Sequence, residues 1–362
     1  MSLFDILKSR VDQEAQKLLY FSIDPAHTDR ALNAQPIQAG RHYFRLWLSE
    51  MFLRKKVQFF KQWRPAVHSL VKFDFGDQQV EIPNIADESK IGMQEQGQGD
   101  VVARNYVLTP LMPFNGGVVE IEAGLVAVQG ANYLDTLIKV MGDFASLLAV
   151  PQLSSALSVA QPLANGLQAL FGAGNSALQL GFHDAFVGGG AGAASPLQEG
   201  YIAVIRATEA DVRKERLWVV KDELREGAGL SDGQHAPFQA FDHMLFFIEV
   251  REERDDWNQL TSIREPFQQA INALGDADET KADAFLRAAI VAALQSPELT
   301  KADRRRVVTV LKAEFDSVKA DLGYAGLVAA PGPILETSMK RAMSVELALQ
   351  MGEPTFEEVF GV

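Results

Sequence analysis

Histidines and clustered carboxylates are the residues of this chain whose types could support hydrolysis or metal binding. Among its 6 histidines, His183 and His243 each stand beside an aspartate in a stretch that reads as a β-strand. Neighbours on a strand point to opposite faces, so neither pair can bind one ion alone, although the two histidines could meet across a sheet. We expect structural, hydrogen-bonded histidines here, and the sequence predicts no catalytic residue and no metal site.

An acidic cluster lies near the end of a predicted strand. Its carboxylates are interleaved with two arginines, in the order Glu249, Arg251, Glu252, Glu253, Arg254, Asp255 and Asp256. Paired carboxylates act as acid and base in many hydrolases. Arginines at this spacing neutralise carboxylates, so we interpret the cluster as an ion-paired strand end. The sequence contains no HExxH, nucleophile-elbow, P-loop or kinase motif that would support a hydrolase or a kinase.

A glycine-rich segment, Gly188 to Ala193, formally fits the GxGxxA pattern of dinucleotide-binding proteins. That pattern binds a pyrophosphate where a helix begins directly after it. Here Ser195 and Pro196 follow, and then another predicted strand. We therefore predict a surface loop and no cofactor. The chain also has 0 cysteines, which excludes disulfides, thiolate zinc sites and cysteine nucleophiles.

A basic and aromatic cluster stands out in a chain whose net charge is −13. Such a mixture is typical of a membrane interface or of a surface for an acidic partner, and it is also found where the rings of a surface element enter the core. The negative net charge makes nucleic acid an unlikely partner. The residues that we select here as interaction candidates are Arg54, Lys55, Lys56, Phe59, Phe60 and Trp63.

A long segment is almost free of charge, because Asp184 is the single charged residue between Phe144 and Gln198. Periodicity predicts two helices around Val150, and the second has an apolar stripe opposite a face of Gln, Ser and Asn. Pro and Gly residues interrupt the segment, so a static transmembrane helix is not expected. We predict that the helices are wedged against a sheet and that Gln161 and Gln168 lie on a contact face.

The order of the elements predicts an α+β fold. We expect an antiparallel β-sandwich-like domain with an inserted helical hairpin, followed by a C-terminal helical region. The predicted parts are an N-terminal helix in 1–34, a β-sandwich domain in 35–257 with a helical insertion at 131–176, a helical bundle in 258–322, and a linker, helix and tail in 323–362. Within these parts, 2–20 reads as helix and 85–101 as a long loop. Residues 37–52 read as an edge strand, a turn at Gly40 and a long strand from Tyr43 to Phe52, and a helix over about 45–62 is the competing interpretation.

The acidic and aromatic C-terminal tail is a further interaction candidate. Phe356, Val359 and Phe360 could dock in a groove of this protein or of another, or the tail could pack as the last helix of the bundle. The N-terminal residues do not form a secretory signal, and we expect a cytoplasmic protein.

Three functions stay open on the sequence. The first is a non-enzymatic scaffold component of a larger multiprotein assembly, which uses the uncharged hairpin and the tail as contact surfaces. The second is a membrane-active, pore-forming effector that releases the 131–176 hairpin on a trigger such as tail cleavage. The third is a hydrolase with an unrecognised site around His183, His243 and the acidic cluster.

Overall fold

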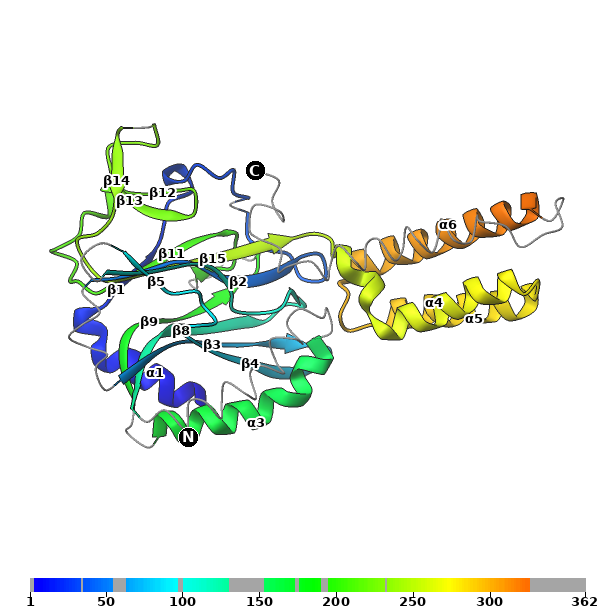
Figure 1. Cartoon of the computed structure of the whole chain (residues 1–362), viewed down its shortest axis with the longest axis horizontal. Helices are drawn as coiled ribbons and strands as arrows, with labels where there is room; N and C mark the ends of the chain where they lie inside the picture. Colours follow the sequence, from blue (N-terminus) through cyan, green and yellow to red (C-terminus); the bar gives the residue numbers. More distant parts are fainter. Residues whose placement is uncertain are drawn as a thin grey trace. The chain divides into compact units, whose positions relative to one another are not determined.

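The computed structural model describes residues 3–33, 35–54, 63–96, 100–129, 153–172, 176–189, 195–231 and 233–325 (Figure 1). The chain divides into two units. One comprises Met1–Thr261 and Ala293–Val307, and the other comprises Ser262–Ala292 and Val308–Val362. The first unit is built on three β-sheets and the second on helices, so the α+β class predicted from the sequence is confirmed.

The largest sheet has 7 strands, in the order β1-β11-β15-β2-β6-β5 with β7 paired to β2. All of its neighbouring strands are antiparallel. A bulge at Ser49 changes the register between β2 and β15, so that Leu48 and Met51 both belong to the core. The strands are β1 (Leu19–Ser22), β2 (Tyr43–Leu53), β5 (Gln94–Gln96), β6 (Asp100–Val107), β7 (Met112–Pro113), β11 (Gly200–Ile205) and β15 (His243–Arg251).

The second sheet has 5 strands, in the order β10-β9-β8-β3-β4. Its pairs are antiparallel except for the short parallel pair of β10 and β9. The long strands β3 and β8 lie side by side in the middle of this sheet. Both contribute apolar side chains to each of its two faces. The strands are β3 (Trp63–Phe75), β4 (Gln78–Asp87), β8 (Val118–Gln129), β9 (Ser176–Val187) and β10 (Ser195–Pro196).

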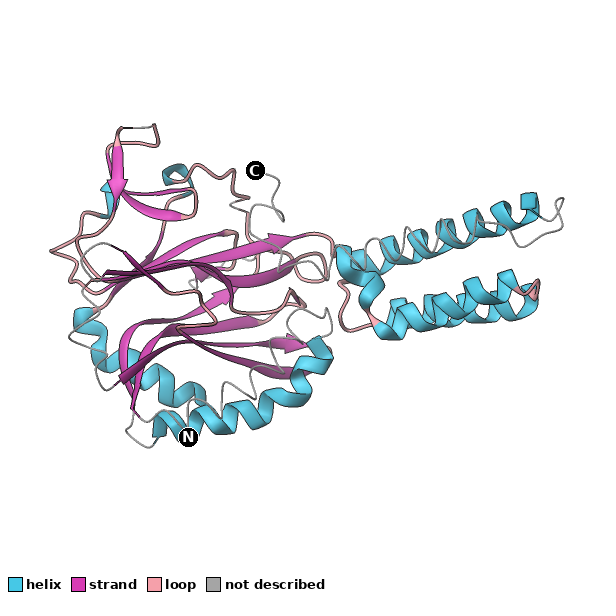
Figure 2. Ribbon diagram, in the orientation of Figure 1, coloured by secondary structure: helices cyan, strands magenta, loops and turns pink. Residues whose placement is uncertain are grey.

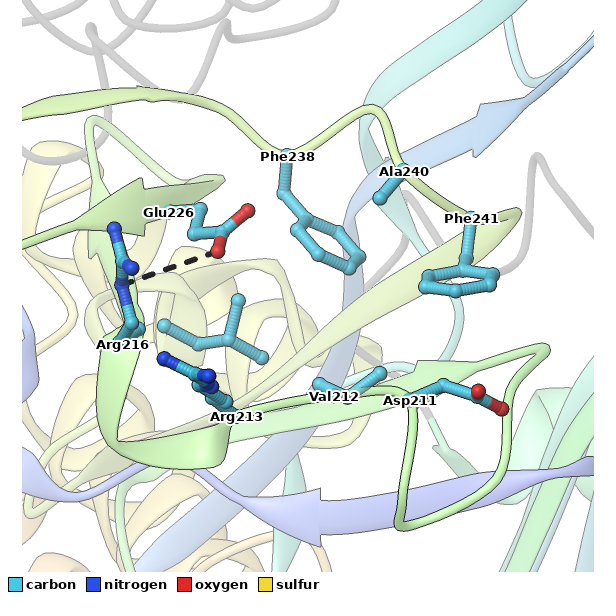
Figure 3. A pocket seen from close by; sticks show the side chains of 9 residues that line it. Asp211, Val212, Arg213, Arg216, Glu226, Phe238, Ala240 and Phe241 are labelled. Atoms are coloured by element: carbon cyan, nitrogen blue, oxygen red, sulfur yellow. Dashed lines mark ion pairs between the residues drawn. The ribbon is translucent and has the colours of Figure 1, made fainter.

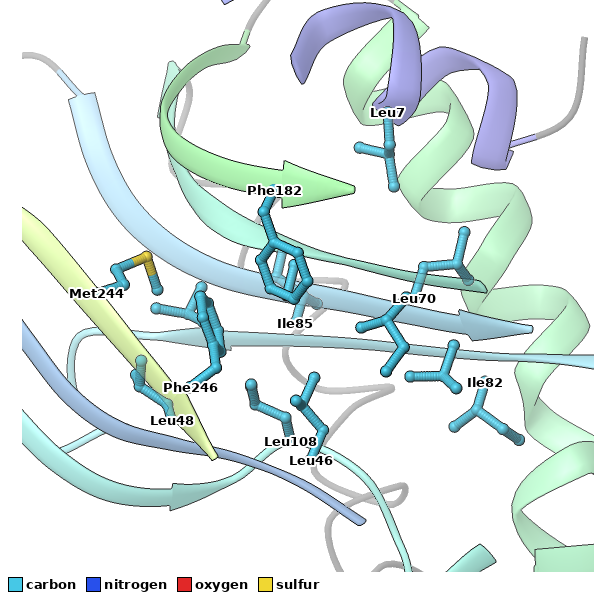
Figure 4. Packing of buried hydrophobic residues seen from close by; sticks show 14 of the residues in the cluster. Leu7, Leu46, Leu48, Leu70, Ile82, Ile85, Leu108, Phe182, Met244 and Phe246 are labelled. Atoms are coloured by element: carbon cyan, nitrogen blue, oxygen red, sulfur yellow. The ribbon is translucent and has the colours of Figure 1, made fainter. Parts of the chain in front are cut away.

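These two sheets pack face to face, as the sandwich prediction requires (Figure 4). Aromatic contacts cross the interface: the Phe44 and Phe73 rings lie 5.7 Å apart, and the Phe182 and Phe246 rings lie 5.1 Å apart. Edge-to-face and tilted aromatic pairs of this kind add about 0.5–1.5 kcal/mol each beyond the area that they bury. The core of the first unit therefore sits between the two sheets.

Two helices cover the outer face of the five-stranded sheet (Figure 2). The helix α1 (Leu3–Glu14) packs on β9, and α3 (Leu153–Gly172) packs on β4 and on α1. The second helix of the predicted hairpin is therefore present and lies against a sheet. The first helix of that hairpin falls in residues outside the described part of the chain.

A small sheet of 3 strands completes the first unit: β12 (Leu217–Val220), β13 (Glu223–Gly227) and β14 (His235–Pro237). It packs beside β2, where the backbone N–H of Leu224 donates to Glu50 Oε2 at 2.7 Å. Short 3₁₀ turns connect the elements of this unit, namely η1 (Ala15–Lys17), η2 (Pro25–His27), η4 (Lys214–Arg216) and η5 (Asp255–Gln259).

The second unit contains the helical C-terminal region that the sequence predicts. It is formed by α4 (Thr261–Gly275), α5 (Glu279–Gln295) and α6 (Lys301–Ala325). The end of α5 from Ala293 and the start of α6 as far as Val307 belong to the first unit. The core of the second unit gathers Leu274 of α4, Ala282 of α5 and Phe315 of α6. An ion pair at 2.8 Å between Lys319 Nζ and Glu279 Oε2 joins α6 to α5 on the surface.

Two local predictions are wrong. The helix predicted for 2–20 ends at Glu14, because the aromatic run Leu19–Ser22 pairs with β11 as β1. The loop predicted for 85–101 contains the end of β4, the whole of β5 and the start of β6. β5 is a short polar edge strand held by backbone hydrogen bonds to β6, so its side chains give little periodic signal. The strand predicted from Tyr43 to Phe52 is confirmed as β2, so the competing helix is wrong as far as Leu53, and residues 55–62 lie outside the described part.

Candidate functional site

The outer face of α3 carries no ionisable side chain, since none occurs anywhere in its 20 residues. Its inner side is apolar and buried at Leu163, Leu167 and Phe171. Its outer side is exposed at Gln161 and Asn165, whose amides share a hydrogen bond at 2.9 Å, and also at Pro162 and Ala169. A surface helix with a neutral outer face can be covered by a partner without leaving a charge unpaired.

Charges from other segments hold both ends of α3. At its N-terminus the backbone N–H of Leu153 donates to Glu298 Oε2 at 3.0 Å, and at its C-terminus Arg10 Nη2 donates to the Phe171 carbonyl. An anion at the start of a helix and a cation at its end complement the helix dipole. The helix itself has no acidic residue in its first turn and no basic residue in its last turn. Glu298 and Arg10 therefore supply the end charges that the helix itself lacks.

A buried histidine and carboxylate form a hydrogen-bonded pair under the C-terminal end of α3. His68 Nε2 on β3 is 2.8 Å from Glu122 Oε1 on β8, and the two side chains are 1% and 0% exposed. The centroids of the Phe171 and His68 rings are 5.3 Å apart. The Arg10 guanidinium lies 5.7 Å from the centroid of the Phe171 ring. His68 Nδ1 has no hydrogen-bond partner among the described residues. This arrangement couples α1, α3 and the sheet.

The acidic cluster is ion-paired, as the sequence indicated. Glu249 is buried, accepts hydrogen bonds from Arg45 Nε at 2.8 Å and from Trp47 Nε1 at 2.7 Å, and also pairs with Arg251. Burial by itself would raise the pKa of Glu249, but these two arginines bring it below its ordinary value. The remaining carboxylates pair with Arg41, Arg306, Arg251 and Arg254. These side chains join segments of the first unit.

The phenol of Tyr43 links this cluster to the start of α6. It donates to Asp303 Oδ2 at 2.8 Å and accepts from the backbone N–H of Thr300 at 3.0 Å. The Thr300 hydroxyl accepts from the backbone N–H of Asp303 at 3.2 Å, the interaction by which a threonine commonly caps the start of a helix. Burial and the Asp303 charge raise the pKa of Tyr43 far above its ordinary value.

The two candidate histidines do not meet. His183 belongs to β9, where its Nε2 is 4.0 Å from Glu120 Oε2. His243 belongs to β15 in the other sheet, where its Nε2 is 3.5 Å from Glu50 Oε2 and its ring stacks on Phe52. Within the described ranges, no group of three or more His, Cys, Asp or Glu side chains is arranged to hold a metal ion.

Two residues of the glycine-rich segment belong to the described part of the chain, the half-buried Gly188 and the exposed Gly189. Gly188 packs against Phe114, because a Cβ at this position would lie 2.4 Å from a ring carbon. The backbone N–H of Gly189 donates to the Ile37 carbonyl at 2.9 Å. Residues 190–194 lie outside the described part, and β10 follows them as a strand in place of the helix that a dinucleotide site needs.

A pocket opens beside the three-stranded sheet (Figure 3). It has a volume of about 340 Å³, at the small end of the range for ligand pockets. Its floor is apolar and buried at Val212, Leu217 and Phe238, and its exposed rim is charged. The complete lining consists of Asp211, Val212, Arg213, Arg216, Leu217, Glu226, Phe238, Ala240 and Phe241.

Arg54, the first residue of the basic and aromatic cluster, is anchored at the edge of this pocket. Its Nη1 donates to the carbonyl of Ala240 at 2.6 Å, and its backbone N–H donates to Asp242 Oδ1 at 2.7 Å. Trp63 is the first residue of β3. The remaining candidates of the cluster and of the tail fall outside the described residues: Lys55, Lys56, Phe59, Phe60, Phe356, Val359 and Phe360.

Sequence reasoning identified Gln161, which is exposed on α3, and Gln168, which is half-buried there. It did not identify the pocket. The lining comes from three short segments that the pairing of β12, β13 and β14 brings together, and no spacing rule connects them. The one available signal was the pair Phe238 and Phe241 within an otherwise polar stretch.

Comparison with known proteins adds no assignment, because no protein-family model, no curated protein and no solved structure matches the chain. Within the part of the chain that the structure describes, no helix has both the length and the apolar character needed to cross a bilayer.

Proposed function

We propose that this protein is a non-enzymatic interaction module, a scaffold component of a larger assembly, and that the outer face of α3 is one of its contact surfaces. The observation that carries the proposal is a surface helix of 20 residues without a charge. A helix that faces only water is ordinarily covered with charged side chains on its outer side. The neutral amides of Gln161 and Asn165 suit a surface that alternates between water and a protein partner.

Two further features support a contact role over a chemical one. The residues considered for a hydrolase are engaged in separate places, with His183 beside Glu120, His243 beside Glu50, and Glu249 between arginines. Both ends of α3 are fixed by Glu298 and Arg10, so its outer face is held in one orientation. A rigid, preorganised surface loses little conformational entropy on binding.

A photo-crosslinking experiment tests this proposal. A photoreactive residue at Asn165, in the full chain and in the cells that produce it, should give discrete crosslinked products. The matched control is the same residue at Lys312, an exposed position on α6. Adding Ala169→Glu on the same face should remove the α3 products, because it forces the partner to bury a carboxylate. Products that are identical at both positions, or that Ala169→Glu leaves unchanged, would contradict the proposal.

Purified protein provides an independent measurement. If the partner includes a second copy of the chain, light scattering should show a mass that rises with concentration and returns to that of a monomer in Ala169→Glu. The substitution lies at an exposed position, so the free energy of unfolding should change by no more than about 0.5 kcal/mol. We further propose a cytoplasmic location, which fractionation of the producing cells would test.

A further inference from the structure

The turn between β7 and β8 consists of an asparagine and two glycines, Asn115, Gly116 and Gly117. Asparagine is a chemically labile residue, and a following glycine exposes its side-chain amide to attack by the next backbone nitrogen, because no side chain hinders the approach. The same dipeptide occurs once more in the chain, at Asn165 and Gly166 in α3. Both asparagines are exposed, so access of water does not distinguish them.

The backbone of the turn leaves both reacting groups free to move. Gly116 and Gly117 have φ angles of +109° and +78°, a region that favours glycine. Within the described ranges, the N–H of Gly116 donates no hydrogen bond to a carbonyl or to a side chain. Among the same residues, the Asn115 side chain makes one hydrogen bond, at the distance limit, with its Nδ2 3.5 Å from the Asp74 carbonyl. Little therefore opposes their approach.

The same dipeptide in α3 lacks this freedom. Asn165 Oδ1 accepts a hydrogen bond from Gln161 Nε2 at 2.9 Å. A backbone N–H inside a helix donates to the carbonyl four residues earlier, so the nitrogen of Gly166 can attack only after the helix opens locally. The packing of α3 on β4 and α1 opposes that opening. The fold therefore exposes one of the two dipeptides to reaction and protects the other.

We propose that Asn115 is a site of spontaneous deamidation in the folded protein. The nitrogen of Gly116 bonds to Cγ of Asn115, the bond between Cγ and Nδ2 breaks, and Nδ2 leaves as ammonia with the proton from Gly116. Water then opens the resulting succinimide at one of its two carbonyls, which leaves aspartate or isoaspartate at position 115. The reaction consumes water alone. The inference goes beyond the interaction role and does not rest on it.

The new carboxylate would have an unfavourable neighbour. Asp74 lies so close to this turn that a Cβ on Gly117 would collide with its Oδ2, and the Asp74 carbonyl would face an anion in place of an amide donor. The preceding residue, Phe114, is buried in the core, and its backbone N–H and carbonyl bond to His42 and Gly40. Deamidation therefore loosens the connection through which the chain enters β8.

Peptide mapping by mass spectrometry of the full chain tests the site. The folded protein is incubated at mildly alkaline pH, and tandem spectra locate the mass gain that accompanies the exchange of an amide NH₂ for OH. We expect this gain at Asn115 to accumulate at least about tenfold faster than at Asn165, since α3 must open before its asparagine reacts. A protease that cleaves at aspartate but not at isoaspartate separates the two products.

The same chain unfolded in guanidinium chloride is the matched control. Both asparagines then precede a glycine in a flexible chain, so their rates should agree within about threefold. Asn115→Gln should abolish the gain at position 115 and leave that at Asn165 unchanged, because the longer side chain forms the cyclic imide far less readily. Asn115→Asp supplies one product from the start and should speed hydrogen exchange in residues 112–118, whereas Asn165→Asp should not.

Three outcomes would overturn the inference. The first is no mass gain at Asn115 in the folded protein under conditions that modify the unfolded chain. The second is an equal rate at Asn115 and Asn165 in the folded protein. The third is the same excess of Asn115 in the unfolded chain, which would show that the neighbouring residues and not the turn set the rate. Unchanged exchange in Asn115→Asp would contradict the loosening of the turn.

Discussion

His68 and Glu122 are both fully buried, under Phe171 and against the five-stranded sheet. Removing one member of such a pair leaves a buried polar group without its partner, which costs about 3–5 kcal/mol, whereas replacing both by apolar groups is often close to neutral. We therefore expect Glu122→Ala to lower the free energy of unfolding by about 3 kcal/mol or more. We expect the double variant His68→Phe/Glu122→Leu to lose clearly less.

Urea unfolding of the purified variants checks this prediction, and the same two strands provide a control. Lys72 and Glu120 form an ion pair at 3.2 Å whose side chains are each 26% exposed. Glu120→Ala should cost no more than about 1 kcal/mol, because solvent screens a partly exposed pair. Equal losses for Glu120→Ala and Glu122→Ala would show that the burial of His68 and Glu122 does not matter in this way.

Two buried tyrosines predict a loss of stability at alkaline pH. Burial and a neighbouring aspartate raise the pKa of Tyr43 and of Tyr201 above the ordinary value of about 10. Above pH 10 the unfolded chain releases these protons and the folded chain keeps them. The free energy of unfolding therefore falls as pH rises, by up to about 1.4 kcal/mol per pH unit for each tyrosine.

Unfolding measured between pH 9 and 11.5 should show this slope, and the double variant Tyr43→Phe/Tyr201→Phe should have a flatter one. The variant will also be less stable at pH 7, since the Thr300 N–H and Asp303 lose the phenol of Tyr43. The comparison therefore concerns the slope and not the absolute value. Tyr106→Phe, at a half-buried tyrosine, is the control. An unchanged slope in the double variant would contradict the assignment.

At the scale of elements, α3 depends on charges that other segments supply. Arg10→Gln removes the cation at its C-terminus and should cost about 1 kcal/mol, with faster hydrogen exchange in the last turn of α3. Glu298→Gln should cost more, because Glu298 Oε2 is also 3.6 Å from the buried Arg254 guanidinium. Lys17→Gln, which alters a surface pair with Glu14, should leave exchange in α3 unchanged. Uniform exchange across all three variants would show that α3 does not need these charges.

The sequence predicts elements well where burial is periodic. β3, β8 and β15 alternate or run continuously apolar, and α3 has a clear apolar stripe, so their types and approximate bounds could be predicted. β5 could not, because its 3 residues are all polar. β1 has only 4 residues and directly follows a helix, and polar residues at Asp100, Arg104 and Asn105 interrupt the apolar residues of β6. The pair of His68 and Glu122 was also missed. These residues are diagonal neighbours through the pairing of Leu70 with Glu122, and strand register is not readable from one sequence.

At the scale of the whole molecule, the uncharged segment raised a choice between a docked helix and a released one. The helix of that segment that the structure describes is docked: α3 has its apolar side buried on β4 and α1, and its neutral side outward. The absence of charge alone could not decide this, because a buried helix and a membrane-active helix both avoid ionisable residues. In the structure, Leu163, Leu167 and Phe171 belong to the hydrophobic core of the first unit.

The membrane-active alternative leads to the last prediction. Releasing α3 would expose Leu153, Leu163, Leu167 and Phe171, which are each no more than 1% exposed. At about 1.5–3 kcal/mol for each side chain, the exposure would cost on the order of 6–12 kcal/mol before any bilayer contact. We expect no dye release from anionic liposomes, either with the full chain or after cleavage at a protease site placed between residues 326 and 333. Release by the cleaved protein that Leu163→Asp abolishes would favour the effector over the scaffold. A melittin control must release the dye from the same liposomes.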